Sequence, residues 1–408
     1  MTNEHTSQKE FIFLVALLTA TVAMSIDTML PALGLIAKDF GVTDPNQRQY
    51  IITTFFGGMT IGTLISGPIS DSTGRKPAIF GGLLIYLAGS ALCLFSTSFE
   101  MLLAGRALQG VGAASPRIVS MAMVRDGQGG AAMARIMSFV MSVFMLVPII
   151  APSIGQLVLF VASWRMIFVG FLGMAVIAAI FLEVRQEETL PKEKRVAFSA
   201  GNLWTAAIEF FRYPVAWGYT IAVGFIFAAF ITYLGTSQQI FTDQYNQGNL
   251  FAVWFGVFAV AIACAMIFNG RMVMHYGMRN LSKWAVRGCI AFSFIFLVVA
   301  LMASGHPPLW TLGLFLFATF FCCGILFGNY NAMAMEPVGH IAGMAAAISG
   351  TLSSIIAIGI GGWIGQHYDG TVMPLVYGYL SMGILALLLS EGVELLKARE
   401  VKNPRLVD

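Results

Sequence analysis

Long apolar runs, separated by short polar segments, recur along the whole chain. Each run holds about 20 residues, which is the length that an α-helix needs to cross a hydrocarbon core of about 30 Å. The runs are unbroken rather than alternating in hydrophobicity, so they predict helices and not barrel strands. The pattern therefore predicts an all-α membrane protein with twelve transmembrane helices. The predicted spans are residues 11–35, 49–69, 78–96, 100–123, 136–159, 164–184, 215–236, 250–270, 282–304, 308–332, 341–365 and 372–396.

The composition supports the same fold class. Of the 408 residues, 58% are hydrophobic and only 11% are charged, whereas a soluble globular domain has roughly 25% charged residues. The 5 cysteines lie inside predicted spans without the spacing of metal ligands or of a disulfide framework, so we expect buried small residues. Lys9 is the only basic residue before the first span and no small-residue cleavage site follows, so we expect this span to remain in the mature protein.

Basic residues are distributed unevenly between the predicted loops. Eighteen Lys and Arg residues fall on one side of the spans, and only Lys38, Arg48 and Arg165 fall on the other; Arg106 and Arg117 lie inside the fourth span. Because basic loops remain in the cytoplasm, this asymmetry predicts that both termini are cytoplasmic and that the number of spans is even. The net charge of +3 then reflects topology and does not indicate a nucleic-acid partner.

A charged segment divides the predicted spans into two groups of six. Residues 185–213 read as a cytoplasmic linker, with an amphipathic surface helix around residues 203–211. The predicted domains are an N-terminal six-helix bundle over residues 1–184, this linker, and a C-terminal six-helix bundle over residues 214–408.

The two halves share a short motif. GPISDSTGRKP at residues 67–77 follows the second span, and GRMVMHYGMRN at residues 270–280 follows the eighth span, 203 residues later. Equal offsets pair Gly67 with Gly270, Gly74 with Gly277 and Lys76 with Arg279. The separation is half of the chain, which indicates two pseudo-symmetric halves and is typical of transporters with a binding cavity near the membrane midplane.

Five motifs in order resemble a known family. GPISDSTGRKP resembles the loop between spans two and three of the major facilitator superfamily, and RALQGVGAA at residues 106–114 resembles its fourth-span signature. SIDTMLPALGLIAKDF in span one, WRMIF at residues 164–168 and MEPVGHIAGMAAAISG at residues 335–350 are similar to the bicyclomycin- and chloramphenicol-resistance branch of the drug/proton antiporters. The resemblance extends over nearly the whole chain. It implies a monomeric antiporter of the bacterial cytoplasmic (inner) membrane, without a cofactor.

The loop after the second span and the end of the fourth span contain a candidate conformational latch. Its residues are Gly67, Asp71, Gly74, Arg75, Arg125 and Asp126. The glycines would allow a tight turn and close helix approach. The loop charges are expected to pair with the charges at the end of span four, or to lie against the positive N-terminus of span eleven, and to change partners between conformations. The alternative is a solvated loop that only sets topology.

The fifth span contains PIIAPSIGQ, residues 148–156, which resembles the antiporter signature of this superfamily in degenerate form. Ala151 and Gln156 stand where glycines are expected. Pro148, Pro152 and Gly155 are still expected to bend the helix and to permit close packing. The alternative is a kinked helix with a purely structural role.

Two opposite charges lie at the same predicted depth in the membrane. Asp27 is the only acid well inside a predicted span, and Arg106 lies in the fourth span. At 1.5 Å per residue, Asp27 is about 12 Å and Arg106 about 11 Å below the outer surface. A charge that faces lipid at the centre of a span costs at least about 2.5 kcal/mol, so we expect both residues to face the interior and to pair.

The predicted pair has two interpretations. A static ion pair would hold the first and fourth spans together. Alternatively, Asp27 is a protonation site, because a low dielectric favours a neutral carboxyl group while a nearby guanidinium favours the charged form, and substrate or helix motion can tip the balance. The family resemblance favours this protonation switch. Related antiporters carry a further acid where this chain has Thr19, so Asp27 would carry the coupling alone.

Residues of the substrate cavity are harder to select, since the chain has 33 Phe and 23 Met. The candidates are Met145, Phe230 and Tyr233, which lie mid-span in helices that border the cavity in the family that the chain resembles. Methionine adapts to varied apolar shapes and suits a promiscuous pocket.

The first functional hypothesis is proton-coupled efflux of small, largely apolar drugs by alternating access. Export of an endogenous metabolite, such as an amino acid or a nucleoside, is the second, and a channel or receptor is a less favoured third. An enzyme is disfavoured because the sequence contains no metal-binding cluster, phosphate-binding loop or nucleophile with a base. The expected partners are a small-molecule substrate, protons and the lipid bilayer, with no metal and no nucleic acid.

Overall fold

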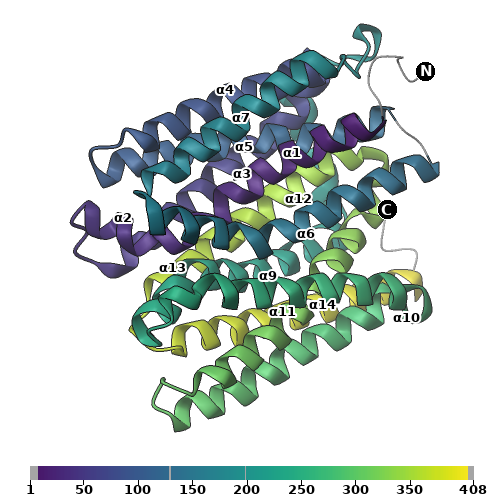
Figure 1. Ribbon diagram of the computed structural model, residues 1–408. Coiled ribbons are helices and arrows are strands. Elements are labelled where there is room, and N and C mark those ends of the chain that lie inside the picture. Colours follow the sequence, from purple (N-terminus) through teal and green to yellow (C-terminus); the bar gives the residue numbers. More distant parts are fainter. Residues whose placement is uncertain (1–7, 128–129, 198, 403–408) are drawn as a thin grey trace. The chain divides into compact units, whose positions relative to one another are not determined.

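The computed structural model describes residues 8–127, 130–197 and 199–402, and helices dominate it (Figure 1). These ranges contain no β-strand, which confirms the all-α prediction. By length and composition, eight stretches of the described residues can cross a membrane; two of them, Gly248–Met302 and Leu309–Gln366, have 55 and 58 residues. Each of these two is long enough for two crossings. Together with the long helices of residues 99–127 and 130–161, they accommodate the predicted twelve spans.

The chain divides into two compact units. The first comprises Met1–Ser199 with Gly248–Gly256, and the second comprises Ala200–Gln247 with Val257–Asp408. The elements up to residue 199 are α1 (Gln8–Asp27), η1 (Leu30–Ala32), α2 (Leu33–Asp39), η2 (Pro45–Gln49), α3 (Tyr50–Thr73), α4 (Arg75–Leu94), α5 (Phe99–Gly127), α6 (Gly130–Val161), α7 (Arg165–Arg185) and η3 (Lys192–Lys194). The later elements are α8 (Ala200–Arg212), α9 (Pro214–Gln238), η4 (Gln239–Gln244), η5 (Gly248–Leu250), α10 (Phe251–Met302), α11 (Leu309–Met335), η6 (Glu336–Ile341), α12 (Ala342–Ile356), η7 (Ala357–Gly361), α13 (Gly362–Gln366) and α14 (Met373–Lys402).

Helix α5 packs against both α3 and α4 in the first unit. Glycines make this packing possible: a Cβ on Gly110 would meet the backbone of Phe55 in α3, and a Cβ on Gly89 would meet the backbone of Gln109 in α5. Close backbone contact through small residues is the usual way in which helices associate in a membrane. The polar residues of α5 are thereby held between two neighbouring helices.

Two adjacent glycines in α3 allow a matched test of this packing. A Cβ on Gly58 would meet the backbone carbonyl of Ala107, whereas a Cβ on Gly57 would have nothing within 4 Å. We expect Gly58→Ala to destabilise the protein by about 1–3 kcal/mol, because backbone atoms cannot easily move aside. Gly57→Ala should be neutral or stabilise by about 0.4–1 kcal/mol, since alanine restricts the unfolded chain. Thermal unfolding in detergent measures both variants, and equal midpoints would contradict the close approach.

The first span is interrupted at Asp27 and is not one continuous helix. Helix α1 ends at this residue, and the short turn η1 separates it from α2. Pro31 lies four residues after Asp27 and has no N–H, so it cannot donate the α-helical hydrogen bond to the Asp27 carbonyl group. The carboxylate therefore lies where the helix is interrupted.

Both copies of the duplicated motif place a glycine where one helix ends and the next begins. Gly74 has a φ of 109° between α3 and α4, and Gly277 has a φ of 76° at a kink inside α10. A positive φ is accessible to glycine at little cost but is unfavourable for other residues. Gly67 instead lies inside α3, where a Cβ would meet nothing within 4 Å. The expected turn is thus formed at Gly74, and the expectation of a tight turn or close approach at Gly67 was wrong.

Aromatic residues pack together in the second unit, where α9 contacts α11, α12 and α14. The rings of Phe230, Tyr233, Phe258 and Phe320 form one aromatic cluster, with 4.8 Å between the centroids of Tyr233 and Phe320. Such ring pairs contribute about 0.5–1.5 kcal/mol beyond the burial of their area. Tyr233 is fully buried in this cluster, whereas Phe230 is partly exposed.

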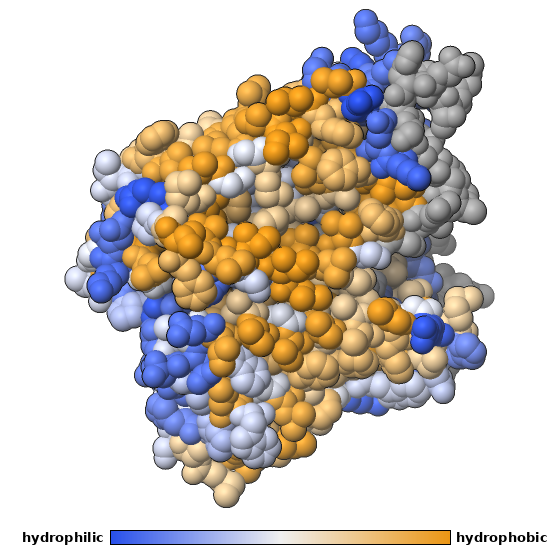
Figure 2. Space-filling model, viewed as in Figure 1, coloured by the Kyte–Doolittle hydropathy of each residue, from blue (hydrophilic) through white to orange (hydrophobic). Residues whose placement is uncertain are grey.

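The molecular surface is apolar along the middle of the helices. On the face shown in Figure 2, hydrophobic residues cover the helix centres and hydrophilic residues gather near the helix ends. Large apolar side chains such as Leu84 and Leu314 are each 65% exposed. Exposed apolar surface of this kind is unfavourable in water and suits contact with lipid.

Candidate functional site

Asp27 is buried at the end of α1, with 7% of its surface exposed. Among the described residues, its carboxylate forms no ion pair with Arg106 and no other salt bridge within 4 Å. The predicted direct pair is therefore not formed in this structure. Depth alone did not reveal this, because two residues at one level can point in different directions.

Arg106 is fully buried in α5 and is held by groups from α3 and α5. Its Nε donates a hydrogen bond to the backbone oxygen of Ile51 at 3.1 Å, and its Nη1 donates to Gln109 Oε1 at 2.5 Å. The guanidinium carbon lies 4.4 Å from the centroid of the Phe55 ring, in a cation–π arrangement. Within the described part of the chain, its Nη2 has no hydrogen-bond partner. The positive charge is thus enclosed but incompletely satisfied.

Hydrogen bonds, together with the side chain of Tyr86, connect Arg106 with α1. Gln109 Nε2 donates to Ser90 Oγ at 2.8 Å, and Ser90 Oγ donates to the backbone oxygen of Tyr86 at 2.8 Å. The Tyr86 hydroxyl in turn shares a hydrogen bond of 2.5 Å with Ser25 Oγ. We call Ser25, Tyr86, Ser90, Arg106 and Gln109 the Arg106 cluster. Through this cluster, Ser25 of α1 is linked to the buried guanidinium of Arg106.

The position of Ser25 explains why Asp27 does not meet Arg106 directly. Successive residues of an α-helix are rotated by about 100°, so residues two apart point in nearly opposite directions. Ser25 faces the Arg106 cluster, and Asp27 consequently faces elsewhere.

Helix α6 contacts α1 beside Asp27. A Cβ on Gly155 would meet the backbone oxygen of Thr28, the residue that follows the carboxylate. Pro152 and Pro148 lie inside α6, about one and two turns before this contact, respectively. The structure thus brings the glycine of the antiporter-like motif against the interrupted part of the first span.

Three of the predicted latch residues form an ionic cluster at the junction between α3 and α4. The Arg75 guanidinium pairs with the carboxylates of Asp71 and Asp126, with 2.7 Å between its Nε and Asp126 Oδ2. Arg75 Nη1 also donates to Ser70 Oγ at 2.8 Å. Arg125 is exposed and forms no ion pair with another described residue. The pairing that joins the two helix ends therefore uses Asp126 and not Arg125.

Glu188 caps the N-terminus of α4 beside this ionic cluster, and the sequence did not predict this role. Its Oε1 accepts a hydrogen bond from the backbone N–H of Arg75 at 2.9 Å, and its Oε2 accepts one from the backbone N–H of Lys76 at 3.1 Å. A carboxylate at a helix N-terminus satisfies free N–H groups and interacts favourably with the helix dipole. Glu188 is one of several acids in the charged segment after α7, so nothing in the sequence distinguished it.

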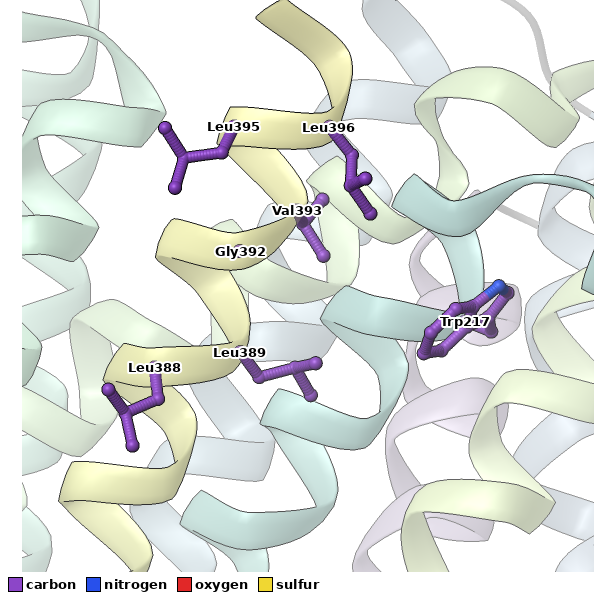
Figure 3. A pocket seen from close by; sticks show the side chains of 7 residues that line it. All are labelled: Trp217, Leu388, Leu389, Gly392, Val393, Leu395 and Leu396. Atoms are coloured by element: carbon purple, nitrogen blue, oxygen red, sulfur yellow. The ribbon is translucent and has the colours of Figure 1, made fainter. Parts of the chain in front are cut away.

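The predicted cavity residues lie in different units. Met145 is partly buried in α6, while Phe230 and Tyr233 belong to the aromatic cluster around α9. Two grooves in the second unit contain none of these residues. One is lined by Trp217 of α9 and residues of α14 (Figure 3), and the other lies along α8. In the part of the chain that the structure describes, no group of three or more His, Cys, Asp or Glu residues could hold a metal.

Comparisons with known proteins agree with this architecture. The chain is 25% identical over 404 residues to a bicyclomycin resistance protein homolog of Haemophilus influenzae, which covers 98% of this chain and 99% of that protein. It is 26% identical over 382 residues to a chloramphenicol resistance protein of Pseudomonas aeruginosa, covering 90% and 87% respectively. Among solved structures, a D-xylose-proton symporter has a TM-score of 0.71 at 14% identity over 93% of this chain and 95% of that one, which shows a shared fold.

The family assignment rests on a match to most of the chain. Residues 15–362 match the Major Facilitator Superfamily. The resemblance noted in five short motifs thus extends over nearly all of the described helices, and the matches to the two resistance proteins cover 99% and 87% of their lengths. The chain therefore belongs to the Major Facilitator Superfamily and is a multi-pass membrane transporter of small molecules, not an enzyme.

Proposed function

We infer that this transporter exports small, largely apolar drugs in exchange for protons, by alternating access between its two halves. Similarity to proteins named for resistance to bicyclomycin and to chloramphenicol supports the substrate class. The proposed location is the bacterial cytoplasmic (inner) membrane, with both termini in the cytoplasm, in agreement with the distribution of basic residues in the loops.

One observation carries the proton-coupling proposal. Asp27 is a buried acid, without a salt bridge to another described residue, at an interruption in a membrane-spanning helix. A permanently charged carboxylate in such a place is unfavourable, whereas a carboxyl group that gains and loses a proton is compatible with it. Two turns earlier stands Thr19, whose side chain is not an acid, so Asp27 has no second carboxylate there. Thr19 is buried, and its hydroxyl donates a hydrogen bond to the backbone oxygen of Val15 at 2.8 Å.

In this proposal, Asp27 and Arg106 communicate through α1 and not by direct contact. Loss of the proton would place a negative charge two residues from Ser25, which is hydrogen-bonded to the Arg106 cluster. The helix backbone that Ser25 and Asp27 share would then transmit the change of charge at Asp27 to the hydrogen bond between Ser25 and the Tyr86 hydroxyl. Helices with such interruptions are common at functional sites of transporters.

The ionic cluster of Asp71, Arg75 and Asp126 would act as the conformational latch. Its pairs join α3, α4 and α5 at one end of the first unit, and Glu188 adds the segment after α7. Charges that pair across helix ends can break and re-form as a transporter changes conformation. In the same proposal, the contact of Gly155 with Thr28 lets α6 respond to movement at Asp27.

Purified protein in liposomes tests the coupling directly. Addition of a transported drug should cause proton movement across the membrane in the opposite direction. One proton that enters along a membrane potential releases about 2.3 kcal/mol per 100 mV, which sustains roughly a 50-fold gradient of an uncharged compound. Transport that is unaffected by an imposed pH gradient would contradict the proposal. Release of an amino acid or nucleoside, without any drug transport, would instead indicate metabolite export.

A further inference from the structure

Helix α8 has two apolar faces: one is buried against the second unit, and the other is exposed among the described residues. Ala206 and Phe210 are buried against Val338, Ala345 and Ile348, which belong to η6 and α12. These contacts fix the helix on the second unit. Its position is therefore determined by packing and not only by the chain connection to α9.

Polar contact reinforces this inner face. His340 Nε2 lies 2.5 Å from Glu209 Oε1, so an imidazole–carboxylate hydrogen bond joins η6 to α8. Glu209 is the acidic residue of α8, and it takes part in this contact. Arg212, at the C-terminal end of the helix, remains as an exposed charge. A basic residue is favourable there, because the C-terminal end of a helix carries partial negative charge.

The other face of α8 is apolar and exposed. Trp204, Ile208 and Phe211 are 70%, 44% and 51% exposed, and their spacing of four and three residues places them on one stripe of the helix. They line a groove together with Ala207 and Arg212. A stripe of large apolar residues with a basic residue at its end is typical of helices that lie in a membrane interface.

The chain connection locates this stripe beside the bilayer. Helix α8 ends at Arg212, and α9 begins at Pro214 as a candidate membrane span. One turn into α9, Trp217 faces a groove formed with Leu388, Gly392 and Leu395 of α14 (Figure 3). Leu388 and Leu395 are each 64% exposed, which suits contact with hydrocarbon. Trp204 and Trp217 thus flank the point where the chain enters the span, as tryptophans commonly do at membrane boundaries.

We propose that the Trp204, Ile208 and Phe211 face of α8 binds the phospholipid surface, with its rings at the level between headgroups and acyl chains and Arg212 directed to phosphate. The bilayer is then a partner of α8 as well as of the spanning helices. Through its buried face, the lipid-bound helix braces η6 and the beginning of α12. This inference concerns lipid binding and does not depend on which substrate is transported.

Tryptophan fluorescence of the full chain in lipid nanodiscs tests the proposal. The contribution of Trp204 is the difference between the wild-type protein and the Trp204→Phe variant, which preserves an apolar ring and so the fold. In discs of phosphatidylcholine brominated on the acyl chain near the headgroup, this contribution should fall by about half or more. Aqueous iodide, which reaches both faces of a disc, should leave it nearly unchanged.

A matched control is Trp164→Phe, which removes a tryptophan that is only 5% exposed and donates a hydrogen bond to Asp39 Oδ2 at 3.1 Å. The Trp164 contribution should respond to neither quencher. Quenching of the Trp204 contribution by iodide but not by bromolipid would show that this face is in water and would overturn the proposal. Protection from both quenchers would also overturn it, because the face would then be covered by protein.

Discussion

Replacing Asp27 by asparagine is expected to abolish proton-driven drug export while leaving the protein folded. Asparagine has nearly the same shape but cannot gain or lose a proton near neutral pH. The roughly 50-fold gradient that one proton can sustain at 100 mV should therefore collapse to the passive level. Drug accumulation in everted vesicles energised with a proton gradient measures this loss, and drug binding to the purified variant should persist.

Asp39→Asn is the matched control for this experiment. Asp39 is the last residue of α2 and ends the same candidate membrane-crossing stretch, Lys9–Asp39; its carboxylate pairs with Arg165, with 2.8 Å between Oδ2 and Nη1. It also accepts a hydrogen bond from the Trp164 indole. Loss of this partly exposed pair should cost at most about 1 kcal/mol of stability and leave gradient-driven export intact. Equal export by Asp27→Asn and the wild-type protein, or equal loss in both variants, would exclude the special role of Asp27.

Arg106→Lys is expected to reduce drug transport more than tenfold although the positive charge is retained. Lysine cannot reproduce the forked contacts of the guanidinium with Ile51 O and Gln109 Oε1. A buried acceptor that loses its donor costs about 1–3 kcal/mol, so the Arg106 cluster should rearrange and its connection to Ser25 should weaken. Initial transport rates in liposomes, with the unfolding midpoint of the same samples, measure the two effects separately.

Arg117→Lys is the matched control for Arg106→Lys. Arg117 lies in α5 eleven residues after Arg106 but is exposed, and its Nη1 lies 3.9 Å from Met59 Sδ. Arg117→Lys should therefore transport at close to the wild-type rate. If Arg106→Lys lowers the unfolding midpoint but transports normally, Arg106 only holds helices together, and the static interpretation of this residue is correct.

Most of the fold followed from residue patterns. The long apolar runs predicted an all-α membrane protein, and the structure and the family match confirm this class. The tight turn expected at the glycines of the first-half motif is formed at Gly74, and its counterpart in the second half, Gly277, also has a positive φ. The amphipathic segment after residue 200 is a helix, α8. These features depend on hydrogen bonding and polarity within one segment, so a single sequence contains the information.

The candidate site was less predictable, since its contacts come from segments far apart in the chain. The sequence singled out Asp27 and Arg106 by their charge, but Ser25 and Tyr86 are ordinary residues that become informative only when they meet. Glu188 similarly becomes informative only through its hydrogen bonds with backbone N–H groups of α4, which lie more than 110 residues earlier in the chain. The interruption at Asp27 had a local signal, because Pro31 stands four residues later and removes a hydrogen-bond donor.

The length and polarity of each segment were enough to predict which segments span a bilayer, where charges occur inside them, and that Asp27 and Arg106 lie at a similar level. Level follows from the constant rise of the α-helix and requires no knowledge of its neighbours. The direction in which each residue points follows from helix packing, since the rotation of a helix about its own axis depends on the helices packed against it. Glycine contacts bring α3, α4 and α5 close together. In that arrangement Ser25 faces the Arg106 cluster, and Asp27, two residues later, points elsewhere.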